Sequence, residues 1–186
     1  MLLIIRILFA LLLLLFLSPV FLFVSVLIFL EDGFPVLFRQ KRIGKGNKIF
    51  QIYKFRTMKN ETPDVATHLL KDSKSYYTKI GPFLRKYSID ELPQLINIIK
   101  NDLAFIGPRP ALYNQKELKN LRIEKGIHHI RPGITGWAQV NGRDNLSITE
   151  KVELDYYYYR RRSFVLNIKI LWLTIIKVFK ASDISV

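Results

Sequence analysis

Residues 7–30 read ILFALLLLLFLSPVFLFVSVLIFL, and this stretch decides how the chain is organised. It holds no charged residue and, as a helix, is long enough to cross a bilayer. A cleaved signal peptide is the alternative, but the run exceeds the usual apolar region of such peptides and no small-residue cleavage site closes it. The sequence therefore predicts a membrane anchor.

Ser18-Pro19 lies in the middle of this anchor. Proline removes a backbone N–H and bends a helix axis. In lipid, the carbonyl that loses its donor needs another, which the Ser18 hydroxyl or a neighbouring segment can supply. A kinked span would place the two ends on opposite sides of the membrane, whereas a sharply broken, re-entrant helix would return both to one side. The residue pattern leaves both topologies open.

The segment behind the anchor is strongly basic. Between Gly33 and Asn60 there are eight Lys or Arg and no acid, so the positive-inside rule predicts a cytoplasmic body. The whole chain has 29 Lys and Arg against 15 Asp and Glu, a net charge of +14, which favours lipid headgroups, phosphates or nucleic acid as partners. Because there is no cysteine, disulfides, thiolate zinc sites and a cysteine nucleophile are excluded.

The remaining pattern predicts one α+β domain, mainly helical. Residues 36–42 and 48–57 are strand-like runs around the turn 44–47 (GKGN), which predicts a β-hairpin. Residues 60–79 are polar, and we expect helix or loop there. Apolar residues at helical spacing predict a helix that begins near Asp90 and ends by Asn101.

Three later segments break or change this pattern. Residues 107–110 (GPRP) and 131–136 (RPGITG) are turns that present arginines on rigid loops. Residues 164–180 form an apolar run that holds three lysines and no acid, behind the stretch 156–162 (YYYYRRR). The run predicts either an amphipathic helix at the membrane interface or a buried core helix whose lysines extend to solvent.

The start of the helix near Asp90 supports two interpretations. In the structural one, Ser88 and Glu91 form a capping box, or Asp90 is itself the N-cap, with Pro93 in the first turn. Taken alone, capping is favoured. In the functional one, the free N–H groups and positive dipole end attract a phosphate and keep Asp90 ionised. A carboxylate beside a bound phosphoryl group can then attack phosphorus and form an acyl phosphate.

Asp90 and Glu91 should have different roles, because adjacent helical residues diverge and cannot face each other as a glycosidase pair does. Acidic oxygens beside phosphate oxygens make a Mg²⁺ site, while Arg and Lys neutralise the remaining charge. For any single cation a solvated surface position is the simpler interpretation, so only convergence would matter. The candidates in or beside turns are Lys54, Arg56, Arg85, Arg109, Arg131 and Arg143.

Several familiar motifs are missing: Walker A, G-x-G-x-x-G, D-x-D and H-E-x-x-H. His68, His128 and His129 lack metal-ligand spacing with any acid, and we interpret them as structural or surface residues.

These residues resemble a known family, the small monotopic phosphoglycosyl transferases, which are bacterial sugar transferases that begin lipid-linked glycan assembly. The resemblance covers nearly the whole chain behind a Ser-Pro membrane helix. It rests on four motifs in order: residues 53–58 (YKFRTM), Arg85 with 88–94 (SIDELPQ), 107–110 and 131–137 (RPGITGW).

The resemblance implies transfer of a sugar 1-phosphate from a UDP-sugar to polyprenyl (undecaprenyl) phosphate, with Mg²⁺ and release of UMP, as the first membrane step of glycoconjugate or polysaccharide assembly. It implies that Asp90 is the nucleophile of a ping-pong reaction through a covalent phosphosugar, and that Glu91 assists at the metal or in proton transfer. The substrate-binding candidates that follow from it are Lys54, Arg56, Arg85, Arg109, Arg131 and, more weakly, Asp155 beside Glu153.

The resemblance also implies the topology. Residues 1–31 would form a re-entrant helix broken at Ser18 and Pro19, and residues 32–186 a catalytic body on the cytoplasmic face of the bacterial inner membrane, held by interfacial helices and membrane lipids. Many relatives carry further spans or a domain ahead of this unit, so we expect only the catalytic core and no second function. A homodimer is compatible with these features.

Two functions from other classes compete: a membrane-anchored basic module that binds nucleic acid or another anionic polymer, and an assembly scaffold. Neither explains acids next to Pro93 amid turn-borne arginines. We therefore expect an enzyme with no nucleic-acid partner.

Overall fold

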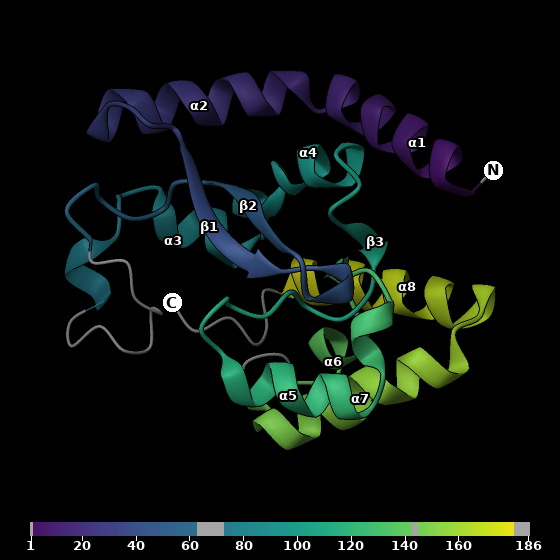
Figure 1. Cartoon of the computed structure of the whole chain (residues 1–186). Coiled ribbons are helices and arrows are strands. Elements are labelled where there is room, and N and C mark those ends of the chain that lie inside the picture. The colour runs from purple at the N-terminus through teal and green to yellow at the C-terminus, as the bar shows by residue number, and fades with distance from the viewer. Residues whose placement is uncertain (1, 63–72, 143–144, 181–186) are drawn as a thin grey trace.

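The structure is a computed structural model that describes residues 2–62, 73–142 and 145–180. Its first two helices, α1 (Leu2–Phe16) and α2 (Ser18–Asp32), form a bent layer over the rest of the chain (Figure 1). The pair is bent by 59°. By length and composition, no single helix in the described part of the chain is able to cross a membrane, whereas the bent pair together is.

The bend follows from Pro19 in the first turn of α2. Pro19 has no N–H for the Leu15 carbonyl, and the Ser18 hydroxyl donates to that carbonyl instead, at 2.7 Å. The expectation that Ser18 can satisfy the freed carbonyl is confirmed.

The predicted hairpin is present. Strands β1 (Leu37–Ile43) and β2 (Ile49–Phe55) pair antiparallel, from Leu37 opposite Phe55 to Ile43 opposite Ile49, and the 3-10 turn η1 (Lys45–Asn47) joins them. Buried side chains of β2 reach both N-terminal helices: Ile52 packs with Ala10 of α1, and Phe55 with Ile28 of α2. The hairpin therefore connects the helical layer to the body.

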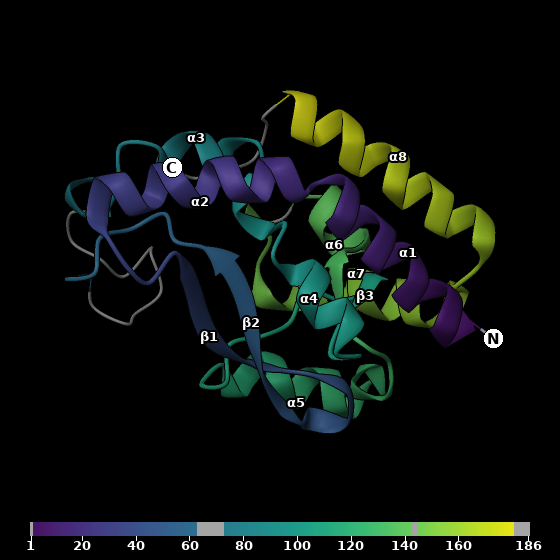
Figure 2. The ribbon, with the colours of Figure 1, turned by 90° about the horizontal axis from the view of Figure 1, so that it is seen from above.

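The helix predicted from Asp90 to Asn101 is shorter and broken. After η3 (Ser73–Tyr76) and α3 (Gly81–Lys86) comes a single 3-10 turn, η4 (Ile89–Glu91), and only then α4 (Gln94–Ile99). Helix α4 lies against α1 (Figure 2). In the polar segment 60–79, residues 63–72 lie outside the described residues.

A second, parallel sheet was not predicted. Strands β3 (Ala104–Ile106) and β4 (Gly133–Thr135) pair with Ala104 opposite Gly133 and Ile106 opposite Thr135. A side chain on Gly133 or Gly136 would collide with the backbone of Gly107. Because all three are glycine, the two proline-containing loops, 107–110 and 131–136, pack backbone against backbone.

The last helices form a third cluster around a core that includes Ile127, Val152 and Ile170. It contains α5 (Lys116–Glu124), η5 (Ile127–His129), α6 (Trp137–Val140), α7 (Ile148–Arg161) and α8 (Phe164–Lys180). In α8, Ile170 is buried while Phe164 and Phe179 are about four-fifths exposed, at 79% and 80%. Helix α8 is therefore amphipathic and not a buried core helix.

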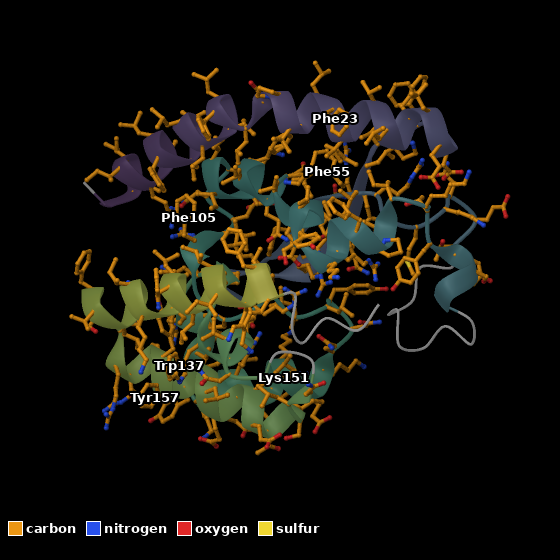
Figure 3. All side chains as sticks on the ribbon, turned by 180° about the vertical axis from the view of Figure 1, so that it is seen from behind. Phe23, Phe55, Phe105, Trp137, Lys151 and Tyr157 are labelled. Atoms are coloured by element: carbon orange, nitrogen blue, oxygen red, sulfur yellow. The ribbon has the colours of Figure 1, made fainter. Side chains whose placement is uncertain are left out.

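Together these elements confirm a mainly helical chain with a short antiparallel hairpin. Figure 3 shows side chains that project outward from α1, α2 and α8. Apolar residues account for many of them, among them Leu12, Phe23 and Trp172, each more than 60% exposed.

Candidate active site

Asp90 and Glu91 lie in η4, between α3 and α4, and both are buried, at 6% and 7% exposure. The turn begins at Ser88, whose φ of 55° is left-handed and redirects the chain after α3. Neither η4 nor α4 has a side-chain cap. The predicted capping by Ser88 with Glu91, or by Asp90, is therefore wrong, because the left-handed Ser88 does not direct its hydroxyl to the turn. The carboxylates of Asp90 and Glu91 are instead contacted by side chains from other segments.

Lys54 joins the two carboxylates. Its ammonium group, carried by β2, lies 2.7 Å from Glu91 Oε1 and 3.4 Å from Asp90 Oδ2. Strand β2 packs directly against η4 and α4, which fixes the lysine at this position. The side chains of Asp90 and Glu91 thus contact the same ammonium group, although side chains of adjacent residues in a helical turn point in different directions.

Arg109 reaches the same pair from the 107–110 loop. Its guanidinium lies 3.2 Å from Glu91 Oε1. Arg85 is close enough to interact electrostatically with Asp90. It is held by Thr57 and Tyr77 at 2.9 Å each. Three of the predicted phosphate-binding cations, Lys54, Arg85 and Arg109, therefore converge on the acidic pair.

Burial raises the pKa of Asp90, and the charge of Glu91 adds to the increase, whereas Lys54 and Arg85 oppose it. The carboxylate is thus poorly hydrated but faced by cations. A poorly hydrated carboxylate that remains ionised is a stronger nucleophile than a solvated one. The arrangement suits attack on an electrophile that itself carries negative charge.

Arg56 binds residues at the end of α2. It is buried, at 4% exposure, and its guanidinium donates to the carbonyls of Asp32 and Gly33 and pairs with the Asp32 carboxylate at 3.1 Å. These contacts fasten the end of α2 to β2. These contacts give Arg56 a structural role, and its predicted role in substrate binding stays a prediction.

Asp155 is bound by another side chain of the protein. Buried in α7, it receives a two-pronged contact from Arg122 of α5, at 3.1 Å and 2.6 Å. Burial raises the pKa of Asp155, which Arg122 opposes. The neighbouring Glu153 pairs at the surface with Lys125, at 2.7 Å. The structure thus pairs Asp155 with Arg122, and its predicted role in substrate binding stays a prediction.

Arg122 extends this contact to the acidic pair. Its remaining guanidinium nitrogen donates to the Arg109 carbonyl at 2.9 Å, and the Arg109 side chain reaches Glu91. A continuous chain of polar contacts therefore runs from Asp155 through Arg122 and Arg109 to Glu91. Sequence reasoning missed Arg122, since a single arginine on a charged helix gives no signal of its long-range partners.

Arg131 lies away from this cluster. Its Nε donates to the Asn101 carbonyl at 2.8 Å, beyond the far end of α4 from Asp90. This contact places Arg131 at Asn101, just past the end of α4. Its predicted role in binding a substrate phosphate stays a prediction. Arg143 and His68 lie outside the described residues. The rings of His128 and His129 in η5 contact each other in a tilted arrangement, with centroids 3.9 Å apart.

Within the ranges described, no three His, Asp or Glu side chains are grouped for a metal ion. Magnesium, however, is commonly held by one or two carboxylates together with substrate phosphates and water. Asp90 and Glu91 match that donor set, and both contact the Lys54 cation. The residues present thus fit Mg²⁺ that arrives with a phosphorylated substrate.

Residues 2–181 match the model of a protein family described as bacterial sugar transferase. The chain is 44% identical over 174 residues to a Bacillus subtilis (strain 168) protein named uncharacterized sugar transferase EpsL, covering 90% of this chain and 82% of that protein. It is 40% identical over 177 residues to the UDP-glucose:undecaprenyl-phosphate glucose-1-phosphate transferase of Escherichia coli (strain K12). It is 39% identical over 168 residues to the UDP-N-acetylgalactosamine-undecaprenyl-phosphate N-acetylgalactosaminephosphotransferase of Aeromonas hydrophila.

The last two matches cover 91% and 88% of this chain but only 38% of each relative. The chain therefore spans less than half the length of these two proteins.

Proposed function

Because the chain belongs to the bacterial sugar transferase family, we propose that it is a phosphoglycosyl transferase that moves a sugar 1-phosphate from a UDP-sugar to undecaprenyl phosphate. UMP is the second product. Relatives whose names specify both substrates support the donor and acceptor classes. Their different sugars, N-acetylgalactosamine and glucose, leave the sugar of this chain open. The observation that carries the proposal is the buried Asp90–Glu91 pair, contacted by Lys54 and Arg109 from two other segments.

In the first half-reaction, Asp90 attacks the phosphorus that bears the sugar. A bond forms from the carboxylate oxygen to that phosphorus, and the bond from the phosphorus to the bridging oxygen breaks, so that UMP leaves with the electron pair. Lys54 and Arg85 keep Asp90 ionised before attack, and Arg109 is placed to neutralise phosphate oxygens.

In the second half-reaction, a phosphate oxygen of undecaprenyl phosphate attacks the same phosphorus. The bond to Asp90 breaks, the carboxylate is regenerated, and the lipid diphosphate sugar forms. When bound, Mg²⁺ supplies positive charge to the phosphate oxygens, with Asp90 and Glu91 as its protein ligands. Glu91 also holds Lys54 and Arg109 in place through its own charge.

The lipid acceptor requires a membrane location. We propose that α1 and α2 form a re-entrant helix in the bacterial cytoplasmic membrane, so that the N-terminus and the body share the cytoplasmic face. The bend of 59° and the basic residues that follow α2 support this topology. The exposed apolar face of α8 would then lie at headgroup depth.

The test is to incubate purified protein with a panel of UDP-sugars and Mg²⁺, without lipid, and to measure the intact mass. We expect a phosphosugar adduct whose mass identifies the sugar, and loss of the adduct on treatment with hydroxylamine, which cleaves acyl phosphates. Asp90→Asn should give none, whereas Glu117→Gln, which removes an exposed acid on α5, should behave like the wild type. An adduct that persists in D90N would assign the nucleophile elsewhere.

A membrane-anchored basic binding module is the second candidate. It predicts that D90N keeps full function and that chelation of Mg²⁺ has no effect, so the same assay, extended to turnover with undecaprenyl phosphate, separates the two.

A further inference from the structure

A second group of cations lies at the far end of α4 from Asp90. Arg6 of α1 donates to the side-chain oxygen of Asn101, and Arg131 donates through Nε to the Asn101 carbonyl at 2.8 Å. Asn101 has a left-handed φ of 67°, and in this conformation its carbonyl and its side chain bind one arginine each. A single residue therefore organises two guanidinium groups from distant parts of the chain.

The positive charge of this pair is not compensated by the protein. In the part of the chain that is described, neither Arg6 nor Arg131 has a carboxylate within ion-pair distance. The two guanidinium groups are close enough for their charges to interact, and they repel. Arg6 Nε is also buried without a hydrogen-bond partner. The buried Arg6 Nε lacks an acceptor, and the two guanidinium groups repel each other. Both features favour the binding of an anion between Arg6 and Arg131.

The surroundings identify the kind of anion. Ile5 and Leu8, on either side of Arg6 along α1, are 54% and 59% exposed. Phe9 contacts Phe105 of β3, with ring centroids 5.4 Å apart, and Figure 3 shows Phe105 between α1 and α8. A charged residue on an apolar helix surface is costly unless it meets a headgroup or a counter-charge. Guanidinium groups bind phosphate through paired hydrogen bonds.

We propose that Arg6 and Arg131 form a binding site for the phosphate of an anionic membrane phospholipid, held by Asn101. The site goes beyond the proposed catalytic function, since α4 separates it along the chain from the nucleophile. The bound lipid would fix the start of α1 to the loop ahead of β4 and so anchor the body beneath its membrane helix.

Two other sources of the same phosphate chemistry are the acceptor, undecaprenyl phosphate, and free phosphate. Native mass spectrometry of the full chain in mixed micelles of phosphatidylglycerol and phosphatidylcholine, with undecaprenyl phosphate or inorganic phosphate added in separate arms, distinguishes them. For the wild type we expect the phosphatidylglycerol-bound form to exceed the phosphatidylcholine-bound form by about fivefold or more, the factor that one basic contact near a lipid surface supplies. Millimolar inorganic phosphate should not abolish this preference.

The variants are Arg6→Gln, Arg131→Gln and Asn101→Gly. The first two remove one charge each and should bring the preference close to one. Glycine at 101 tolerates the left-handed φ, keeps the carbonyl for Arg131 and releases only Arg6, so N101G should lower the preference without removing charge. Lys116→Gln removes one exposed charge from α5, on the side of the molecule away from α1 and α2 (Figure 1), and should keep the wild-type preference.

Circular dichroism should show that all four variants are folded. The proposal is overturned if R6Q and R131Q bind phosphatidylglycerol as K116Q does. It is equally overturned if phosphate competes fully, which would indicate a free-anion site, or if the variants lose only undecaprenyl phosphate, which would assign the site to the acceptor. None of these results depends on the adduct at Asp90, so this inference and the catalytic proposal fail separately.

Discussion

Lys54 is the residue that most directly controls the charge of Asp90. It is the leading influence that lowers the pKa of Asp90 against the effect of burial. Because Asp90 as the proposed nucleophile must be ionised, activity should fall as the pH drops through that pKa. Lys54 thereby extends the active range toward lower pH.

Lys54→Met should therefore raise the pKa of Asp90 and move the acidic limb of kcat/KM to higher pH. With one phosphate-neutralising charge removed, we also expect roughly a hundredfold lower kcat/KM at neutral pH. Lys100→Met is the matched control, because Lys100 contacts Tyr53, the neighbour of Lys54, and no acid. A pH profile measured from pH 4.5 to 9 checks the prediction, and an unchanged acidic limb in K54M would contradict it.

Arg122 is a positioning residue, since it acts on Glu91 only through Arg109. Lysine at this position can keep one bond to Asp155 but cannot also hold the Arg109 carbonyl. Arg122→Lys should thus lower kcat/KM by about tenfold while the protein stays folded. In an Arg109→Met background, R122K should have little further effect on kcat/KM, because the group it positions is gone.

Lys125→Gln is the control for R122K. Lys125 also joins α5 to α7, through Glu153, but this pair is exposed to solvent and contributes little. Kinetics of the four proteins of the cycle, together with Tm values, check the prediction. If R122K and R109M have additive effects, Arg122 stabilises the fold without positioning Arg109.

At the level of elements, the break between α1 and α2 is local chemistry. It combines a missing N–H at Pro19 with a replacement donor at Ser18, 2.7 Å from the Leu15 carbonyl. Both residues stand in the sequence, and the expected pairing is confirmed. The topology of this helix pair in a membrane stays a prediction.

The double substitution Ser18→Ala with Pro19→Ala should straighten this pair, because alanine 19 restores the backbone donor and favours a continuous helix. With a straight helix, the N-terminus of a fraction of the molecules would lie on the outer side of the membrane. The chain has no cysteine, so one cysteine added before Met1 can be labelled with an impermeant maleimide in intact spheroplasts. We expect no external labelling with the wild-type break and clear labelling with the double substitution.

Asn120→Cys, at an exposed position of α5, provides the matched control for labelling. It should stay protected in both backgrounds, because the proposed topology keeps the body in the cytoplasm. External labelling of the N-terminal cysteine with Ser18 and Pro19 intact would rule out the re-entrant topology.

Other elements were predictable only in part. The hairpin is marked by strand-like runs around a glycine turn, and it is present. The helix start at Asp90 was not predicted correctly, because a left-handed Ser88 replaces the expected cap. The chain does contain a capping box at the start of α7, where Ser147 and Glu150 bind each other's backbone N–H. Similar sequence signals thus had opposite outcomes: Ser88 is left-handed before η4, whereas Ser147 is extended and caps α7.

At the scale of the whole molecule, exposed apolar residues lie on α1, α2 and α8. The acidic pair lies in the body, where Lys54 and Arg109 contact it. The proposed ping-pong reaction would separate the two substrates, because the UDP-sugar would come from water and the acceptor from lipid. Damage to the α8 face should therefore affect only the second half-reaction.

Trp172→Glu, at a position 63% exposed on α8, tests this separation. We expect an unchanged yield of the phosphosugar adduct but several-fold slower transfer to undecaprenyl phosphate in vesicles, because a carboxylate at headgroup depth is repelled by anionic lipid. Lys116→Gln, which makes the same change of one charge unit on α5, should leave both half-reactions unchanged. Equal loss of both half-reactions in W172E would contradict the assignment of α8 to the membrane interface.

The sequence by itself determined the anchor, its Ser-Pro break, the hairpin, the family and the acidic pair, because each depends on neighbouring residues or on a short motif. Only the tertiary structure decided which cations serve that pair. Lys54, Arg85 and Arg109 converge on it, while Arg56 fastens α2, Asp155 holds Arg122, and Arg131 joins Arg6 at Asn101. In the sequence, each of these is a charged residue with no nearby feature that identifies its partner. Their roles differ because burial and long-range pairing, which no local pattern encodes, assign each charge its partner.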